Sequence, residues 1–238
     1  MFECLCEGKI MSNTMMVDAD PRLKHPCNIS LAGPTQVGKS YLAAQLIEKK
    51  DRVFNPVPAN VIWCYALWQP LYDTLKDKGL VNEFVQGIDG YKEYLKGDVG
   101  NLVIIDDLQR EAQETDAVAS MFERGGHHED VSIMYITQNI FHQGKKCRDI
   151  NLNCHYLFLF KNKRDMSQIT TLARQVAPGK TKFVQEAYDI ACSSPHGYLM
   201  FDFHHQSHPD LKYRTDLLCL ANDQEDSCCC TVFTLNKD

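Results

Sequence analysis

A glycine-rich loop of eight residues constrains the fold of this 238-residue chain more than any other feature. It reads Gly33-Pro-Thr-Gln-Val-Gly-Lys-Ser40 and fits the pattern G-x-x-x-x-G-K-[ST] in full. A short, largely apolar run at residues 28–32 precedes it and predicts a strand. Apolar residues at positions 42, 43, 46 and 47 then predict a helix over residues 40–50. Strand, loop and helix in this order are the context that a phosphate-binding loop requires.

The chemistry of a triphosphate explains each position of this loop. Glycines let the backbone direct its N–H groups at the phosphates, and the following helix adds the positive end of its dipole. Lys39 is predicted to reach the β- and γ-phosphates, and the Ser40 hydroxyl to bind Mg²⁺. We therefore predict an ATP-binding loop rather than a glycine-rich turn that binds nothing. Its residues are Gly33, Pro34, Thr35, Gln36, Val37, Gly38, Lys39 and Ser40.

A second motif lies about 65 residues downstream, where an apolar strand predicted at residues 102–105 ends in Asp106 and Asp107. Ligands of open α/β sheets bind at the carboxyl ends of the strands, so both carboxylates should face the nucleotide. Asp106 is predicted to hold Mg²⁺, directly or through water. Asp107 is predicted to orient or deprotonate the attacking water. The alternative is a solvated acidic turn, which the loop upstream disfavours.

A polar strand end supplies a third candidate. The strand predicted at residues 131–137 is followed by Gln138 and Asn139. An amide there can lie between the magnesium carboxylate and the γ-phosphate, and we choose Gln138 as this sensor. The alternative is an ordinary turn at the end of a strand.

Hydrolysis by ring-shaped motors usually also needs an arginine from a neighbouring subunit, which stabilises charge on the γ-phosphoryl group. Arg124, Arg148 and Arg164 are the candidates, and Arg148 is preferred because it follows the sensor strand within a basic segment. Any of the three could instead lie on a surface that contacts DNA. The adjacent His127 and His128 are read as part of a solvated turn.

Short apolar runs alternate with helical patterns along the chain. This alternation predicts an α/β fold with a mostly parallel central sheet covered by helices on both faces. With the two motifs, the class is a P-loop NTPase with an additional strand and a catalytic acid. Further strands are predicted at residues 60–65, 156–160 and 197–202, and further helices at residues 71–78 and 111–124, the latter ending at Gly125 and Gly126.

The ends of the chain differ from its centre. Residues 1–20 are interpreted as a flexible leader, 21–219 as the ATPase domain and 220–238 as a cysteine-rich tail. We expect the 11 cysteines to be reduced and mostly buried, with zinc binding by Cys4 and Cys6 or by the cysteines at 228–230 a minor alternative. No targeting segment or membrane span is recognisable, which predicts a protein of the cell interior that is not secreted.

Charge is distributed unevenly. The net charge of −6 argues against a general nucleic-acid coat protein. Residues 145–182, however, carry a net charge of +7, which leaves −13 on the remainder. Such a basic stretch can follow a DNA backbone, or it can be a solvated face that includes contacts to nucleotide phosphates.

Several blocks together resemble the genome-packaging ATPases of Polinton/Maverick elements and related double-stranded DNA viruses. They are the phosphate loop, Ile-Trp63-Cys-Tyr65 with Trp68-Gln-Pro-Leu-Tyr72, Val-Ile-Ile-Asp-Asp107, and Gly-Gly-His-His128 followed by Tyr-Ile-Thr-Gln-Asn-Ile-Phe141. Leu-Phe-Lys-Asn-Lys-Arg-Asp165, Leu172-Ala-Arg-Gln175 and Gly197-Tyr-Leu-Met-Phe-Asp202 extend the resemblance over residues 26–217. The cysteine-rich ends do not match the family.

This resemblance implies an FtsK/HerA-type motor that uses ATP and Mg²⁺. It implies a homo-oligomeric ring, transiently at a vertex of the procapsid, that pumps double-stranded DNA into the shell. Its partners would be DNA and capsid or portal proteins, in the cytoplasm or nucleus of a host cell. The alternatives are a helicase or mobile-element ATPase without a packaging role, a non-hydrolysing protein that binds DNA or a partner, and a small-molecule kinase.

Overall fold

The computed structural model describes residues 19–97, 99–115, 117–128, 130–140, 150, 152–218 and 230–234. Strands in this part of the chain are β1 (Leu23–Lys24), β2 (Asn28–Ala32), β3 (Phe54–Asn55), β4 (Asn60–Tyr65), β5 (Glu83–Gln86), β6 (Asn101–Asp106), β7 (Val131–Thr137), β8 (Tyr156–Phe160), β9 (Tyr198–Asp202), β10 (Tyr213–Thr215) and β11 (Thr231–Val232). Helices are α1 (Lys39–Glu48), α2 (Lys50–Val53), α3 (Pro70–Asp77), α4 (Gln109–Glu114), α5 (Ala117–His128), α7 (Ser167–Val176) and α8 (Thr181–Ala191), with 3₁₀ turns η1 (Asp89–Tyr94) and η2 (Pro209–Leu211).

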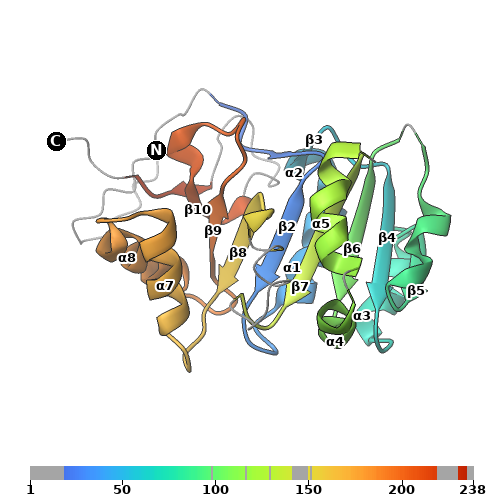
Figure 1. Cartoon of the computed structure of the whole chain (residues 1–238), viewed down its shortest axis with the longest axis horizontal. Helices are drawn as coiled ribbons and strands as arrows, with labels where there is room; N and C mark the ends of the chain where they lie inside the picture. Colours follow the sequence, from blue (N-terminus) through green and yellow to red (C-terminus); the bar gives the residue numbers. More distant parts are fainter. Residues whose placement is uncertain are drawn as a thin grey trace.

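The centre of the molecule is a nine-stranded sheet with the order β11-β10-β9-β8-β2-β7-β6-β4-β5 (Figure 1). Strands β8, β2, β7, β6, β4 and β5 run parallel, and β9, β10 and β11 continue the sheet antiparallel. Strand β7 therefore separates β2, which leads into the glycine loop, from β6, which carries Asp106. This inserted strand agrees with the additional-strand class, and the α/β fold class is confirmed.

Helices cover both faces of the sheet, as expected for parallel strands that are apolar throughout. Side chains of α1, α2 and α3 pack on one face, around Trp63 and Phe158. Helices α4, α5, α7 and α8 cover the other face (Figure 1). Their side chains pack around Ile105 and Phe201. All residues of β2, β6, β7, β8 and β9 are buried, which explains why their apolar runs could be recognised in the sequence.

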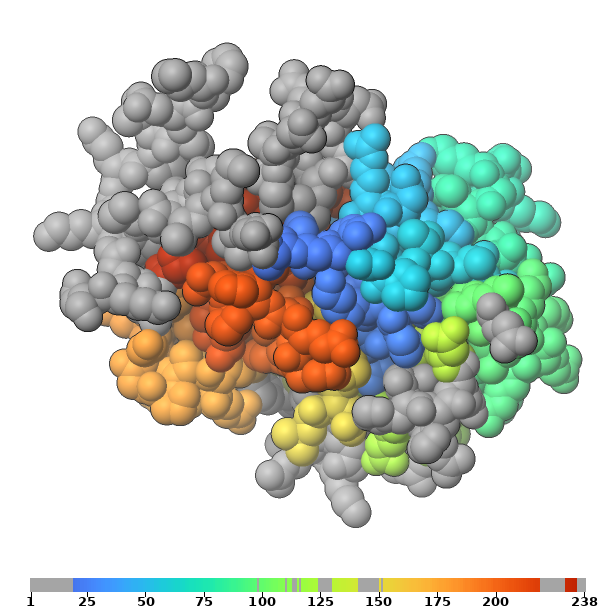
Figure 2. Space-filling model, turned by 90° about the horizontal axis from the view of Figure 1, so that it is seen from above, coloured from blue at the N-terminus to red at the C-terminus, as the bar shows by residue number. Residues whose placement is uncertain are grey.

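Distant parts of the chain meet at the edge of the molecule opposite the glycine loop, where the parallel strands begin. Arg214 of β10 donates to the Pro21 carbonyl at 2.6 Å and to Asp202 Oδ2 at 2.6 Å, and both charged side chains are buried. Figure 2 looks onto this edge and shows the segment around η2 beside the start of the described chain. Strand β11 comes from the segment interpreted as a tail, and it pairs with β10.

The strands predicted at residues 28–32, 60–65, 131–137 and 156–160 coincide with β2, β4, β7 and β8. Two helix predictions were wrong in detail. The helix expected over 40–50 ends at Glu48, and α2 follows as a separate turn. The helix expected over 111–124 is divided, because the backbone of Thr115 is extended between α4 and α5.

Gly125 and Gly126 were expected to end that helix, yet α5 continues through them to His128. His127 and His128 are therefore helical and do not form the expected turn. Burial of Val118 and Phe122 against the sheet stabilises α5, and such packing overrides the low helix propensity of glycine.

The cysteines in the described part of the chain are buried: Cys27, Cys64, Cys154, Cys192 and Cys230. Burial raises the pKa of the Cys27 thiol to about 12, so it behaves as a small apolar side chain. Cys4, Cys6, Cys228 and Cys229 lie outside the described residues. No helix among the described residues has the length and apolar character that spanning a bilayer demands.

Candidate nucleotide-binding site

The glycine loop follows β2 and ends in α1, as predicted. The Gly33 amide donates to the Thr137 carbonyl at the end of β7, with N and O 3.3 Å apart. Only glycine fits at this position, because a Cβ would lie 2.7 Å from Phe160 Cβ. Gly38 has a φ of 99° and precedes the first residue of α1, so it turns the chain into the helix in a conformation that other residues rarely adopt.

Lys39 is the first residue of α1, and its ammonium group lies inside the curve of the loop. Nζ donates to the carbonyl oxygens of Gly33, at 2.7 Å, and Pro34, at 2.6 Å. Burial lowers the pKa of Lys39 to about 8, although the charges of Asp106 and Asp107 act to raise it. Phosphate oxygens would replace these carbonyls as stronger, negatively charged acceptors.

Ser40, in the first turn of α1, contacts Asp106 at the end of β6, although 66 residues separate them in sequence. The Ser40 hydroxyl donates to Asp106 Oδ1 at 3.1 Å. Asp106 is the last residue of β6 and is only 2% exposed. Burial raises the pKa of its carboxyl group, while hydrogen bonds from Ser40 and Tyr72 act to lower it. The predicted pair of metal-binding oxygens is therefore assembled at the carboxyl ends of the strands.

Asp107 directly follows β6, and unlike Asp106 its side chain is exposed. Its backbone has a φ of 57°, in the left-handed region that aspartate and asparagine tolerate better than most residues. Its charge acts on Lys39 and on Asp106, which locates its carboxylate beside the same group of residues. A solvated carboxylate next to a buried one is suited to contact water.

Gln138 is exposed and directly follows β7, the strand between the glycine loop and Asp106. A second amide side chain reaches this strand end. Gln109, at the start of α4, has its Nε2 atom 3.4 Å from Thr137 Oγ1. Gln138 is thus at the expected strand end, and its role as a sensor stays a prediction.

Two hollows flank the outer side of the loop. The larger, of about 610 Å³, lies between Thr35 and Gln36 of the loop, Lys163 and Arg164 after β8, and the turn before β9. The smaller, of about 150 Å³, is lined by Tyr41, Tyr198 and Asp216 among others. His196 borders both, and its Nδ1 atom lies 2.9 Å from the Val37 carbonyl oxygen. A base and ribose have room on this side of the loop.

The arginine candidates fall in different places. Arg164 is exposed in the loop after β8, and Arg124 belongs to α5. Arg148, the preferred candidate, lies outside the described residues.

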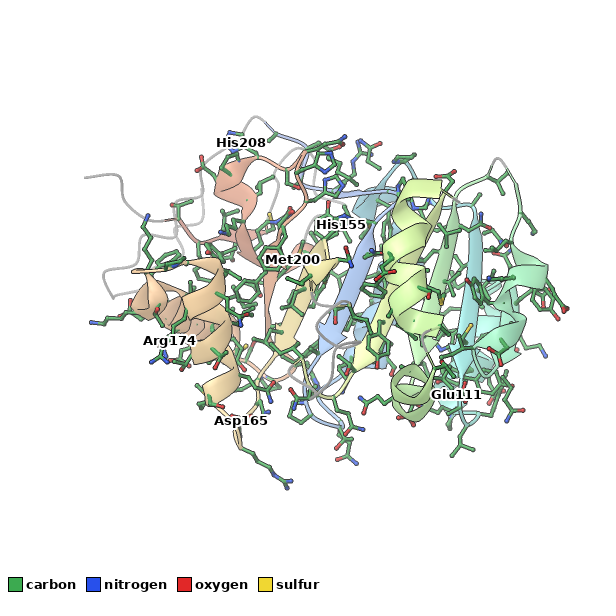
Figure 3. The ribbon with its side chains drawn as sticks, viewed as in Figure 1. Glu111, His155, Asp165, Arg174, Met200 and His208 are labelled. Carbon is green, nitrogen blue, oxygen red and sulfur yellow. The ribbon has the colours of Figure 1, made fainter. Side chains whose placement is uncertain are left out.

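In Figure 3, Glu111 of α4 and Asp165, just before α7, mark the edge at which the parallel strands end. The Asp165 carboxylate accepts hydrogen bonds from the Ser167 amide and the Gln168 side chain at the start of α7.

The oxygens of Ser40 and Asp106 fit Mg²⁺, which prefers a hydroxyl, one or two carboxylates, and phosphate oxygens. Elsewhere in the described part of the chain, no group of three histidine, cysteine, aspartate or glutamate side chains is placed to hold a metal. The donor set therefore fits a metal that arrives with a nucleotide.

Three neighbours of the site were not found from the sequence: Tyr72, Gln109 and His196. The Tyr72 hydroxyl donates to Asp106 Oδ2 at 2.9 Å, over a separation of 34 residues. The block from Trp68 to Tyr72 was noticed in the sequence, but its contact with Asp106 depends on how α3 packs. His196 could not be predicted, because a single histidine in a loop forms no recognisable sequence motif.

The fold is that of P-loop NTPases, and Lys39, Ser40 and Asp106 lie together at the carboxyl ends of its parallel strands. No family model matches the sequence, and no curated protein matches it. Among solved structures, the DNA-packaging ATPase B204 of Sulfolobus turreted icosahedral virus is similar, with a TM-score of 0.52 and 12% identity over 74% of this chain and 92% of that chain.

The genome-packaging NTPase B204 of Sulfolobus turreted icosahedral virus 2, in complex with ATP-γ-S, is similar to the same extent. Its TM-score is 0.50 and its identity 13%, over 74% of this chain and 92% of that chain. At such identities the comparison establishes a shared fold. This chain therefore has the fold of viral packaging NTPases, which is the coarser part of the resemblance seen in the sequence.

Proposed function

We propose that this chain is an ATP-hydrolysing motor that moves double-stranded DNA of a virus or mobile element into a capsid. One observation carries the ATPase part: Ser40 and Asp106 meet at 3.1 Å beside the buried Lys39, at the carboxyl ends of β2 and β6, which β7 separates. The packaging part is supported by the two B204 neighbours, which are packaging enzymes with the same fold. The finer assignment to the Polinton/Maverick and FtsK/HerA group belongs to this proposal.

The residues of the site have distinct tasks in this proposal. The loop amides from Gly33 to Ser40 and the Lys39 ammonium bind the phosphates. Ser40 and Asp106 would hold Mg²⁺, which supplies positive charge to the β- and γ-phosphate oxygens when bound. Asp107 accepts a proton from the attacking water, or orients it, because its exposed carboxylate lies beside the buried pair. Gln138 hydrogen-bonds that water and the γ-phosphate.

The partners follow from the same proposal. Subunits form a homo-oligomeric ring in which Arg148 of one subunit approaches the nucleotide of the next. Basic side chains in the stretch from 145 to 182 follow the DNA backbone, and Lys163 and Arg164 are exposed there. Capsid or portal proteins hold the ring at a vertex, inside the host cell.

Steady-state ATP hydrolysis, with and without linear double-stranded DNA, tests this proposal. We expect Mg²⁺-dependent hydrolysis that DNA stimulates. Lys39→Ala should abolish it, because the loop loses the cation that contacts the β- and γ-phosphates. Lys76→Ala, on the exposed side of α3, is the matched control and should hydrolyse ATP as the wild type does.

Each part of the proposal can fail separately. Nucleotide binding without any turnover would contradict the ATPase part and favour a non-hydrolysing binding protein. Turnover that DNA never changes, even with capsid proteins added, would contradict the motor part. DNA-stimulated strand separation without packaging into capsids would replace the packaging role with that of a helicase.

A further inference from the structure

Tyr72 has no assigned role, yet it lies at the centre of the site. Its side chain is fully buried, and its hydroxyl donates to Asp106 Oδ2 at 2.9 Å. The other oxygen of this carboxylate, Oδ1, accepts the bond from Ser40. The two oxygens of Asp106 are thus distinguished, because Oδ1 faces the phosphate loop and Oδ2 faces α3.

The position of the phenol is fixed by its surroundings. Helix α3 begins at Pro70, which is well placed because the first turn of a helix needs no amide donor there. The ring of Tyr72 then packs among four aromatic rings, with centroid distances of 5.5 Å to Trp63, 5.6 Å to Tyr65, 5.6 Å to Trp68 and 5.8 Å to Phe84. We call these five residues the aromatic cluster. A ring held on several sides cannot easily turn its hydroxyl away.

In this bond the Tyr72 hydroxyl donates and the Asp106 carboxylate accepts. A bond from a hydroxyl to a carboxylate is charge-assisted. Such charge-assisted bonds are shorter and stronger than bonds between neutral groups.

We propose that Tyr72 is the positioning residue for the metal carboxylate: it holds Asp106 Oδ2, so that Oδ1 and Ser40 Oγ together present oxygens to Mg²⁺. The inference rests on the proposed function, since it assigns Asp106 to the metal. Hydrogen-bond partners of metal ligands typically change metal affinity by about 10- to 100-fold when they are removed. Tyr72 contacts Asp106 alone of the predicted ligands, so it acts through that carboxylate.

The test is Tyr72→Phe, which keeps the ring and removes the hydroxyl. We expect Mn²⁺ to bind the complex of protein and non-hydrolysable ATP analogue about 10-fold more weakly, as measured by electron paramagnetic resonance. Affinity for the same analogue without a divalent metal should be unchanged. In hydrolysis, the Mg²⁺ concentration for half-maximal rate should rise, and the rate at saturating Mg²⁺ should approach that of the wild type.

Tyr65→Phe is the matched control, because it removes a hydroxyl from the same aromatic cluster and leaves the hydrogen bond from Tyr72 to Asp106 in place. It should bind Mn²⁺ as the wild type does. In an Asp106→Asn background, Tyr72→Phe should weaken Mn²⁺ binding no further, since its route to the metal is lost. Thermal denaturation of each variant confirms that it is folded.

Unchanged Mn²⁺ affinity in folded Tyr72→Phe would overturn the positioning role while leaving the proposed ATPase intact. Equal weakening in Tyr65→Phe would also overturn it, because the effect would then belong to cluster packing. A wild-type protein that binds metal and nucleotide together but never hydrolyses ATP would instead contradict the proposed function alone. Failure of the wild type to bind the metal–nucleotide complex would overturn both.

Discussion

Two adjacent aspartates end β6, and the structure gives them different environments. Asp106 is 2% exposed and hydrogen-bonded at both oxygens, whereas Asp107 is exposed. The sequence predicted both positions, because a buried strand before the acids and a glycine loop upstream are local patterns. It could not predict the Tyr72 contact, which depends on packing between α3 and β6. Contacts between side chains of distant segments leave no periodic pattern in the sequence, so they cannot be predicted from it.

Asp107→Asn tests whether Asp107 acts on the attacking water while Asp106 holds the metal. Asparagine also tolerates the positive φ at this position, so the backbone should be unaffected. Without a carboxylate to accept a proton, we expect kcat to fall about 100-fold or more, with ATP affinity nearly unchanged. Single-turnover hydrolysis and equilibrium binding of a fluorescent nucleotide measure the two quantities. Asp89→Asn, an exposed control in η1, should change neither, and normal turnover in Asp107→Asn would remove Asp107 as the base.

At the scale of elements, the long buried strands were more predictable than the short strands towards the two edges of the sheet. Strands β2, β4, β7 and β8 are buried apolar runs and coincide with their predicted ranges. The short β5, β10 and β11 were not predicted, because two to four residues are too few for a pattern. Helices α7 and α8, which bury Leu172 and Val184, were not predicted either.

The end of β9 predicts a pH dependence of stability. His204 is 8% exposed and stacks on Tyr156, with His155, His205 and Lys24 nearby and Asp202 accepting its amide. Burial, with the neighbouring positive charges, lowers the pKa of His204 to about 4. Between the ordinary value near 6.5 and about 4, the unfolded chain binds a proton that the folded chain does not, so stability falls as the pH falls.

We expect this histidine to cost on the order of 1 kcal/mol of unfolding free energy between pH 7 and pH 5. Urea denaturation at the two pH values measures the difference. His204→Gln should lose less stability on acidification than the wild type. His208→Gln, at an exposed site before η2, should behave as the wild type does. The same pH dependence in His204→Gln would mean that other groups account for the acid sensitivity.

At the scale of the whole molecule, the proposed ring assigns two halves of one site to different subunits. Lys39 would come from one subunit and Arg148 from the next. A heterologous, head-to-tail interface of this kind can be tested by mixing two inactive variants. Lys39→Ala retains the arginine, and Arg148→Ala retains the phosphate loop.

Neither variant alone should hydrolyse ATP, but an equal mixture should recover roughly a quarter of wild-type activity, since about one interface in four then pairs an intact loop with an intact arginine. Arg164→Ala in place of Arg148→Ala is the matched comparison, because Arg164 is exposed after β8. Full activity of Arg148→Ala alone would exclude it as the acting arginine. Two inactive variants that fail to complement, although sedimentation shows mixed rings, would place the arginine within its own subunit.

The aromatic cluster has one more consequence. The chain contains two tryptophans, and both belong to this cluster, with Trp63 buried and Trp68 43% exposed. Their emission therefore originates only a few side chains from the predicted metal carboxylate. The unmodified protein carries an optical reporter beside its own site, so the arrival of a metal–nucleotide complex should be visible as a change in tryptophan fluorescence, without any dye attached.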